Sequence, residues 1–331
     1  MNPDPRSQRW RRLALSTVCL LAQGAIAFDL QGHRGARGLV PENTLAAFAT
    51  AAAIGVDTLE LDTVLTGDGV VVVSHEPRLN PNLARDASGR WVDPPGPAIR
   101  QLTLAELQAY DVGRLRPDSR YGQGFPQQRP VDGERIPQLA AVFEQARRNG
   151  DLAIRFNIET KLSPLEPDLA PAPEAFVRSV LAVVDEHGLR GRVTLQSFDW
   201  RTLAVAQRLA PDVPTVCLSS QQPWGDNVAD PRWTAGLSLA THGSVPRLVK
   251  VAGCAFWSPY FGDLSAALLA EAHALKLPVI VWTINEPAQI EQMLDLGVDG
   301  IISDRPDRVR EAMARRGMTL PTRTPVATAV R

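Results

Sequence analysis

The sequence predicts a (β/α)8 barrel, in which eight parallel strands alternate with helices around a closed sheet. From residue 28 onward, short apolar runs alternate with helix-like patterns, which is typical of parallel strands joined by helical crossovers. About eight such units fit within roughly 285 residues, and this number favours a barrel over an open doubly wound sheet. No G-x-G-x-x-G motif follows a predicted strand, which argues against a dinucleotide-binding fold.

The composition of the 331-residue chain argues against several classes of protein. Hydrophobic residues make up 44%, enough for a substantial core, and the length suits one large domain or two small ones. The formal net charge of −1 argues against a broad basic surface for nucleic acid. Three cysteines are too few for a disulfide framework or a Cys-rich zinc site. No apolar run reaches the ~20 residues of a membrane span.

Residues 1–27 have the pattern of a secretory signal peptide. Arginines precede an apolar stretch at 13–22, and Ala25-Ile26-Ala27 matches the small-x-small cleavage pattern. We expect export, to the periplasm in a bacterium, with cleavage after Ala27. An uncleaved anchor is the alternative, although the stretch is short for spanning a membrane. Removal of four Arg and one Asp shifts the formal net charge from −1 to −4.

The first half of the chain holds the early strands and one long irregular segment. An Ala-rich pattern ended by Gly55 predicts a helix. An alternating run predicts a strand, and the valines after it predict either a hairpin partner or an extension of that strand. Residues 77–134 contain eight Pro and six Gly, so we expect an insertion that folds over one end of the barrel. Thr103 and Glu106 form a capping box for its one clear helix. The predicted strands are 29–31, 56–66, 70–74 and 152–159, and the predicted helices are 44–54, 103–110 and 138–149.

The second half of the chain continues the alternation with shorter connections. Gly188 and Gly297 directly follow helical patterns, as helix C-termini require, and short apolar runs between the helices predict strands. Residues 316–331 carry Thr and Pro without an apolar period, which predicts a mobile tail after a barrel domain at 28–315. The predicted strands are 193–198, 213–218, 255–258, 279–283 and 300–302, and the predicted helices are 174–187, 201–209, 232–241, 264–275, 288–296 and 304–315.

Cys217 and Cys254 are predicted to be free, largely buried thiols. An oxidising compartment permits a disulfide in principle. However, Cys217 falls near the end of one predicted strand and Cys254 near the start of the next. In neighbouring parallel strands these positions lie at opposite ends of the barrel, whereas bridged Cα atoms must lie within roughly 7 Å.

Polar side chains stand where several predicted strands end. Residues two apart on a strand share a face, so Glu60 and Asp62 point the same way, and Glu159 and Lys161 repeat this spacing. The carboxyl ends of barrel strands converge on one mouth, where active sites of this fold lie. We therefore expect these side chains to lie close together. Further polar or aromatic side chains near strand ends are His33, Arg34, His75, Gln196 and Trp282.

The residue types in this group indicate metal-assisted phosphoester chemistry. Three carboxylates at close range require a cation between them or raised pKa values, and oxygen ligands suit Mg²⁺ or Ca²⁺. Two histidines can act as acid and base near neutral pH. Arg34 and Lys161 add positive charge, which suits an anionic phosphate.

Each of these residues also has a purely structural explanation. Glu60 and Asp62 fit a solvated strand face, and a histidine such as His33 is often a hydrogen-bonded structural residue. Asn43 fits the N-cap of the first helix, and Trp282 fits a core or rim aromatic. The joint occurrence of all the groups favours the catalytic interpretation.

Eight short motifs resemble those of the glycerophosphodiester phosphodiesterases, and their order and spacing hold over about residues 31–306. The resemblance implies a TIM barrel with an insertion between the early strands. It also implies one divalent metal, usually Ca²⁺ or Mg²⁺, and the products glycerol 3-phosphate and an alcohol. The motifs are His33-Arg34-Gly35, Pro41-Glu42-Asn43-Thr44, Glu60-Leu61-Asp62, Ser74-His75-Glu76, Ile158-Glu159-Thr160-Lys161, Gln196-Ser197-Phe198, Val281-Trp282-Thr283-Ile284-Asn285 and Gly300-Ile301-Ile302-Ser303-Asp304.

The resemblance further implies a role for each matched side chain. His33 and His75 become the acid–base pair. The family commonly has Asp after the second histidine, where this chain has Glu76, and the long insertion leaves the preferred alcohol headgroup open. The implied metal ligands are Glu60, Asp62 and Glu159, and the implied or candidate substrate contacts are Arg34, Lys161, Glu42, Asn43, Gln196 and Trp282.

The sequence thus predicts an exported, metal-dependent phosphodiesterase that hydrolyses small glycerophosphodiesters. One alternative is a phospholipase D-like enzyme for lysophospholipids or sphingolipids, which requires an exposed apolar lip such as residues 221–228 with Trp224, or Trp91. A second alternative is a phosphodiester-binding protein without catalysis, although both histidines and all three carboxylates are present. Neither the oligomeric state nor the native metal follows from the sequence.

Overall fold

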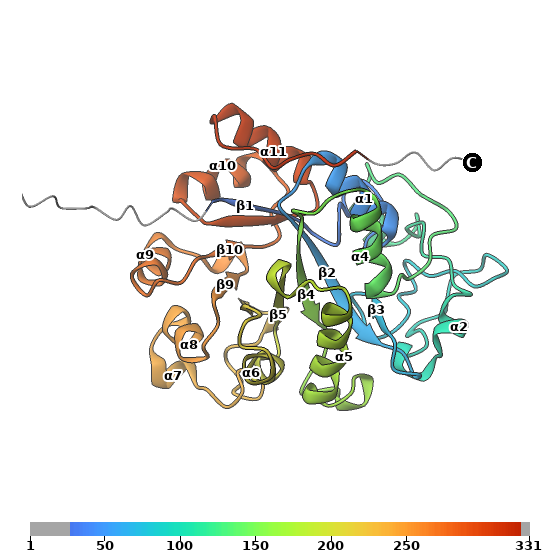
Figure 1. Ribbon diagram of the computed structural model, residues 1–331, viewed down its shortest axis with the longest axis horizontal. Helices are drawn as coiled ribbons and strands as arrows, with labels where there is room; N and C mark the ends of the chain where they lie inside the picture. Colours follow the sequence, from blue (N-terminus) through green and yellow to red (C-terminus); the bar gives the residue numbers. More distant parts are fainter. Residues whose placement is uncertain (1–26, 326–331) are drawn as a thin grey trace, which may run out of the picture.

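The structure, a computed structural model, describes residues 27–325 and forms the predicted barrel (Figure 1). Eight parallel strands form it: β1 (Asp29–Gly32), β2 (Thr58–Leu65), β4 (Arg155–Thr160), β5 (Val193–Ser197), β6 (Thr215–Ser219), β9 (Phe256–Pro259), β10 (Ile280–Val281) and β11 (Gly300–Ser303). The hydrogen-bonded order is β10-β11-β1-β2-β4-β5-β6-β9. Parallel bridges at Trp257–Val279 and Tyr260–Trp282 join β9 to the β10 segment and complete the circle. Of the two alternatives for the valine run, the hairpin is correct, because β3 (Val71–Val73) pairs antiparallel with β2.

Helices cover the outside of the barrel and bury one apolar face each against it (Figure 1). In the longest of them, Phe176, Val177 and Val180 recur at helical spacing and are fully buried. None of the described helices is long and apolar enough to cross a membrane. The barrel helices are α1 (Leu45–Ile54), α4 (Leu139–Arg148), α5 (Pro173–Glu186), α6 (Trp200–Leu209), α8 (Val245–Val251), α9 (Ala266–Ala274), α10 (Pro287–Leu296) and α11 (Pro306–Arg315).

The interior of the barrel is polar on the side of the early strands. Apolar residues of β2, such as Leu61, face the helices, while the alternating residues face inward. Asn157 on β4 donates from Nδ2 to Gln31 Oε1 on β1 (3.0 Å) and to Gln196 Oε1 on β5 (2.8 Å). This buried amide network joins three strands beneath the mouth and leaves its members satisfied.

The inserted segment forms a small lobe beside β2 and β3 with its own apolar core (Figure 1). Its elements are short: η1 (Ile99–Gln101), α2 (Leu104–Leu107) and α3 (Arg120–Gln123), with the predicted capping box of Thr103 and Glu106 present. Gln128 and Arg129 bond to the loop that follows β1, so the lobe reaches the mouth of the barrel. The core residues are Val64, Val72, Leu79, Ala84, Ile99, Leu107, Val112 and Ile136.

The prediction of a helix at 232–241 is wrong. Gly236 and Gly243 take positive φ angles of 88° and 80°, which interrupt a helix, and Ser244 then caps a new helix at Arg247 N. The segment after β6 instead contains the hairpin strands β7 (Gln221–Gln222) and β8 (Gly225–Asp226), then α7 (Leu239–His242) and α8. Short turns η2 (Pro167–Leu169), η3 (Arg190–Arg192) and η4 (Phe261–Asp263) complete the connections.

The described residues cover only a small part of the predicted signal peptide and a larger part of the predicted tail. The predicted signal peptide lies outside the described residues, apart from Ala27. The segment after Arg316, predicted as a mobile tail, packs against the barrel as far as Thr324. That residue is buried and donates from its backbone N to Ala52 O (2.9 Å), and its hydroxyl bonds to Asp151. Residues 326–331 lie outside the described range.

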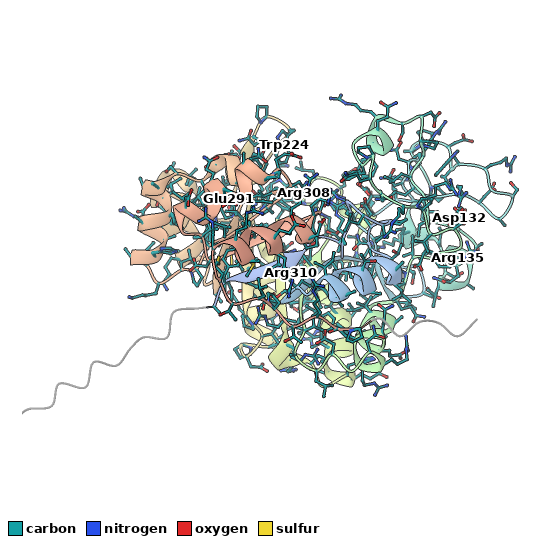
Figure 2. The ribbon with its side chains drawn as sticks, turned by 90° about the horizontal axis from the view of Figure 1, so that it is seen from above. Asp132, Arg135, Trp224, Glu291, Arg308 and Arg310 are labelled. Carbon is teal, nitrogen blue, oxygen red and sulfur yellow. A yellow bond between two sulfur atoms is a disulfide. The ribbon has the colours of Figure 1, made fainter. Side chains whose placement is uncertain are left out.

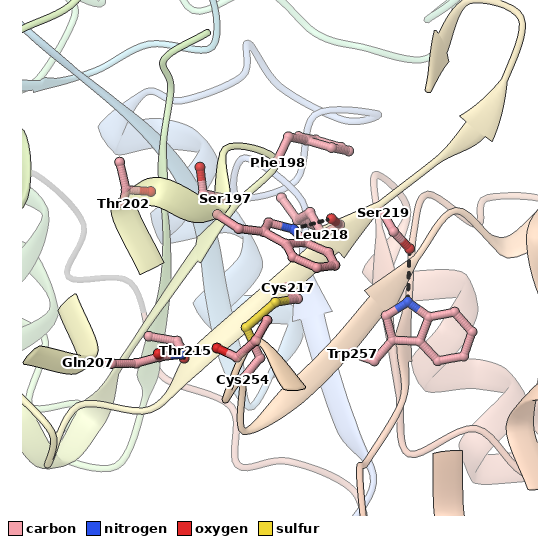
Figure 3. The surroundings of a disulfide bond; sticks show 12 residues. Ser197, Phe198, Thr202, Gln207, Thr215, Cys217, Leu218, Ser219, Cys254 and Trp257 are labelled. Atoms are coloured by element: carbon pink, nitrogen blue, oxygen red, sulfur yellow. Dashed lines mark hydrogen bonds between the residues drawn. A yellow bond between two sulfur atoms is a disulfide. The ribbon is translucent and has the colours of Figure 1, made fainter. Parts of the chain in front are cut away.

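Cys217 and Cys254 form a disulfide, so the prediction of two free thiols is wrong (Figure 3). The strand β6 continues to Ser219, which places Cys217 at its middle, with its side chain between the sheet and the helices. Cys254 lies in the turn from α8, and the next residue, Ala255, donates from N to Thr215 O (2.8 Å). The turn therefore meets the outer face of β6, and the two Cα atoms lie 5.8 Å apart.

The disulfide predicts a measurable cross-link and a stability contribution. Unreduced protein should weigh less than reduced protein by the mass of two hydrogen atoms. Replacing both cysteines by alanine should lower the free energy of unfolding by about 2–4 kcal/mol, because the unfolded chain gains freedom. Urea unfolding measures this loss, and reduced wild-type protein is the control. Two reactive thiols in denatured, unreduced protein would contradict the assignment.

Candidate active site

A tight turn after β1 brings backbone and side chain of Arg34 to the barrel mouth. Arg34 and Gly35 have φ angles of 49° and 83°. A Cβ on Gly35 would lie 2.5 Å from the carbonyl carbon of Ala47, so only glycine fits this close approach. The turn points the Arg34 backbone N at Glu60 Oε2 (2.9 Å), which fixes one carboxylate of the site.

Glu60, Asp62 and Glu159 converge inside the barrel mouth. The β2–β4 register pairs Asp62 with Glu159, and each of the three side chains offers a carboxylate oxygen within 4.8 Å of the others. Burial, together with Asp62, raises the pKa of Glu60 well above its usual value and that of Glu159 to about 7. Burial also opposes ionisation of Asp62, but His75, Arg34 and Lys161 outweigh it and hold its pKa well below the usual range.

This carboxylate cluster fits a hard divalent cation. All three donors are oxygens, as Ca²⁺ and Mg²⁺ prefer, and raised pKa values are the expected response of close carboxylates without a cation. If all of them were ionised, the carboxylates packed around the mouth would outnumber the arginine and lysine side chains by six to three, so the site favours an added cation. The carboxylates are Glu42, Glu60, Asp62, Glu76, Glu159 and Asp304, and the cations are Arg34, Arg37 and Lys161.

Two basic side chains lie against this cluster from opposite sides. Arg34 contacts Glu42 Oε1 through Nη1 (2.5 Å) and lies 3.2 Å from Asp62 Oδ2 through Nε. Lys161 Nζ donates to Glu159 Oε1 (2.8 Å) and lies 3.7 Å from Asp62 Oδ1. Both cations are ion-paired, and both line the cavity, where an anionic group would meet them.

Two amide side chains hold the carboxylates in place. Gln196 donates from Nε2 to Glu60 Oε1 (2.7 Å), and Asn43 donates from Nδ2 to Asp62 Oδ2 (2.9 Å). The expectation that Asn43 caps the first helix is wrong, because Thr44 is the N-cap and accepts from Ala47 N. Asn43 instead has a φ of 55°, which turns its amide toward Asp62.

His33 lies beside the cluster with one ring nitrogen held by Asp304. The distance from Nδ1 to Asp304 Oδ1 is 2.6 Å, and Nε2 lies 3.9 Å from Glu60 Oε2. Arg37 donates to both oxygens of Asp304 (2.7 and 3.0 Å). Burial, with a smaller effect of Arg37, lowers the pKa of His33 to about 4, so the ring is neutral at pH 7.

His75 has the same kind of partner in Glu76. Its Nδ1 lies 2.9 Å from Glu76 Oε1, and Asn80 donates to the other oxygen (3.3 Å). Burial and then Arg34 and Lys161 lower the pKa of His75. Both histidines therefore direct Nδ1 at a carboxylate and have Nε2 as the second nitrogen for proton exchange.

A cavity of about 640 Å³ opens above these groups at the barrel mouth. Most of the residues that the sequence predicts for the site line this cavity. Glu42, Asn43 and Asp62 do not line it, but they contact residues that do. Trp282 lines it and donates from its indole to Ser258 O (2.9 Å). The predicted residues in its wall are His33, Arg34, Glu60, His75, Glu159, Lys161, Gln196 and Trp282.

Several residues of the site have no role in the sequence prediction. Asp304 was expected at the start of a helix, but it follows β11 directly and holds His33. The position of Asp304 directly after a strand is the sequence signal that could have indicated a residue of the site. Arg37 and Asn285 hold Asp304, and Tyr121 of the inserted lobe donates its hydroxyl to Glu42. Tyr121 comes from a segment without periodicity, so no pattern indicates it.

A TIM barrel with carboxylates, histidines and cations at its mouth fits a hydrolase of phosphate esters. The Glycerophosphoryl diester phosphodiesterase family model matches residues 33–308. The chain belongs to this family and is a glycerophosphodiester phosphodiesterase, a hydrolase.

Individual relatives span almost the whole described chain. The glycerophosphodiester phosphodiesterase of Caldanaerobacter subterraneus subsp. tengcongensis is 27% identical over 285 residues, which cover 86% of this chain and 97% of that protein. A crystallised homologue from Silicibacter pomeroyi is 38% identical with a TM-score of 0.80, and 88% and 95% of the two chains are covered. An Oleispira antarctica phosphodiesterase, crystallised with the product sn-glycerol-3-phosphate, is 23% identical with a TM-score of 0.64 and coverage of 86% and 96%, which supports the fold.

The raised pKa of Glu159 predicts how pH affects the metal-free protein. An acid whose pKa rises from 4.5 to about 7 on folding stabilises the fold below pH 4.5, and this contribution is lost as pH rises through 7. In EDTA, Glu159→Gln should therefore become more stable than wild type as pH increases, by on the order of 2–3 kcal/mol at pH 8. With Ca²⁺ bound, the wild-type protein should instead be more stable than Glu159→Gln. Denaturant unfolding at pH 4.5, 6 and 8 measures both, and an unchanged difference across this range would contradict the account.

Proposed function

We propose that the protein hydrolyses glycerophosphodiesters with one divalent cation, Ca²⁺ or Mg²⁺, held by Glu60, Asp62 and Glu159. The observation that carries this proposal is the buried cluster of three carboxylates, whose oxygens all lie within 4.8 Å of one another. A cation bound there would supply electrostatic stabilisation of the phosphate charge. Arg34 and Lys161 then bind the remaining phosphate oxygens from the cavity wall.

The two histidines move protons in this proposal. One takes a proton at Nε2 from the attacking oxygen, which belongs either to water or to the neighbouring glycerol hydroxyl. The phosphorus–oxygen bond to the alcohol breaks, and the other histidine, which must enter the step protonated on both ring nitrogens, donates its Nε2 proton to the leaving oxygen. Asp304 and Glu76 orient the rings through Nδ1. Attack by water gives glycerol 3-phosphate and the free alcohol directly, whereas attack by the glycerol hydroxyl gives the alcohol and a cyclic phosphate that a water molecule then opens to glycerol 3-phosphate.

We also propose that the enzyme is exported and that residues 1–27 are removed. The disulfide between Cys217 and Cys254 supports this location, because such bonds persist in oxidising compartments such as the periplasm. The substrates in this proposal are small molecules that diffuse into the barrel mouth.

Metal dependence has a direct test. Exhaustive EDTA treatment should abolish release of glycerol 3-phosphate from glycerophosphocholine, and Ca²⁺ or Mg²⁺ should restore it, because the phosphate charge is otherwise uncompensated. Glu60→Gln should raise the cation concentration needed for half-maximal rate by on the order of 10–100-fold. Glu174→Gln, on the exposed face of α5, is the control. Full activity after chelation would eliminate the metal from the proposal.

Single histidine variants test the acid–base assignment. His33→Ala and His75→Ala should each lower kcat by about 10²–10⁴-fold, since each removes one proton transfer, while cation binding persists. A nitrophenyl ester of glycerol phosphate needs little protonation as it leaves. It should rescue one variant, which identifies the acid, and not the other. A histidine whose removal leaves kcat near the wild-type value takes no part in the chemistry.

The same kinetic measurements distinguish the alternatives. A binding protein without catalysis would bind the phosphodiester but release no glycerol 3-phosphate. A lysophospholipase D-like enzyme would require an apolar lip. Trp224 is 63% exposed and lines the cavity, whereas Trp91 packs near Arg85 in the inserted lobe. Preference for lysophosphatidylcholine over glycerophosphocholine would favour that alternative.

A further inference from the structure

The barrel mouth is divided into two chemically different halves by the order of its strands. The charged groups follow β11, β1, β2 and β4, which are neighbours in the sheet. The ends of the other four strands, β5, β6, β9 and β10, are followed by aromatic rings instead. These rings are Phe198, Trp224, Tyr260 and Trp282.

The aromatic rings form one connected cluster. Phe198 and Trp282 have centroids 5.3 Å apart and planes at 87°, and Trp224 lies 6.3 Å from Trp282 at 75°. Tyr260 packs against both tryptophans from behind (5.3 and 5.6 Å). Trp233 adds a further ring to the cavity wall. Neighbouring rings of the cluster thus stand nearly perpendicular to one another.

Trp224 is the outermost member of this cluster. It lies in the hairpin between β7 and β8 and projects from the surface, well away from Asp132 of the inserted lobe (Figure 2). Its indole is 63% exposed and also lines the cavity, so a ligand in the mouth can reach it. Leu165, which is 53% exposed, lines the same cavity.

The charge in the aromatic half is negative. Asp226, at the end of the hairpin, lines the cavity, and its Oδ1 accepts from the backbone N of Val228 and Ala229. Among the described residues, the basic side chains in the cavity wall all belong to the charged half. Arg232 lies nearby in sequence but is paired with Asp230 (2.6 Å) outside the wall.

We propose that the aromatic half binds the alcohol headgroup and selects a quaternary ammonium over a primary amine or a polyol. The proposal rests on the proposed function, which places the phosphate among Arg34 and Lys161. A trimethylammonium group needs no hydrogen-bond acceptors and is attracted by ring faces and by one carboxylate. A primary ammonium or a polyol presents several polar hydrogens, which aromatic rings leave unsatisfied. In the part of the chain that the structure describes, the polar side chains in this half of the wall are few, namely Ser220, Asp226, Asn227 and Thr283, and Asn227 already bonds to the backbone of its neighbours.

Three matched substrates test the selection. They are glycerophosphocholine, glycerophosphoethanolamine and the 3,3-dimethylbutyl ester of glycerol phosphate, which has the shape of the choline ester without its charge. The wild-type kcat/KM for the choline ester should exceed the other two by about tenfold, the effect of a desolvated cation on a tryptophan face. Equal values for the choline and dimethylbutyl esters would overturn the proposal, because the subsite would then bind any alkyl group.

Two variants test whether Trp224 and Asp226 cause the preference for the choline ester. Trp224→Ala should lower kcat/KM for the choline ester by about fivefold or more and change the ethanolamine ester by less than about twofold. Asp226→Asn, whose Oδ1 can still accept from the hairpin backbone, should reduce the preference for the choline ester over the dimethylbutyl ester. Trp91→Ala removes a tryptophan outside the cavity and should leave all three values unchanged. If Trp224→Ala lowered kcat/KM for all three esters by the same factor, the assignment of headgroup selection to Trp224 would be overturned.

A binding measurement separates this proposal from the proposed function. Tetramethylammonium should quench the tryptophan fluorescence of the wild-type protein saturably, and Trp224→Ala should weaken that binding, whether or not any ester is hydrolysed. Saturable, Trp224-dependent binding without hydrolysis would retain the subsite and refute the proposed function. Hydrolysis without such binding would refute the subsite alone.

Discussion

The mutual repulsion of three buried carboxylates is the constraint on which the rest of the mouth depends. Glu60, Asp62 and Glu159 lie in a setting where ionised groups lose their hydration, and only part of this cost is offset by neighbouring cations and amides. The site therefore takes up protons, as the raised pKa values of Glu60 and Glu159 indicate, or it takes up a divalent ion. A fold built only for stability would place apolar side chains here.

The support for this cluster extends well beyond its own strands. Gln196 and the Arg34 backbone hold Glu60, and Asn43 holds Asp62. A second chain of contacts runs from His33 through Asp304 to Arg37, and Tyr121 of the inserted lobe connects Arg37 and Glu42. The inserted lobe thus contributes to the rigidity of the site, although it lies beside the barrel.

Much of this arrangement follows from the sequence, because strand periodicity and strand-end position are local properties. The alternation of Glu60 with Asp62 was enough to predict that both face inward, and the structure agrees. Contacts between distant segments were not predictable in the same way. Cys217 and Cys254 meet because the turn after α8 packs against the outer face of β6, and Tyr121 reaches Glu42 from an aperiodic insertion. The failed helix at 232–241 shows that positive-φ glycines outweigh a weak apolar period.

Calorimetric titration of the metal-free protein with Ca²⁺ in buffers of different ionisation enthalpy tests the central claim most directly. The account predicts one ion per chain and release of protons at pH 6, because Glu60 and Glu159 must lose protons to bind it. The release should shrink as pH rises above the pKa of Glu159, about 7. One bound ion without proton release at pH 6, or no saturable binding at all, would contradict it.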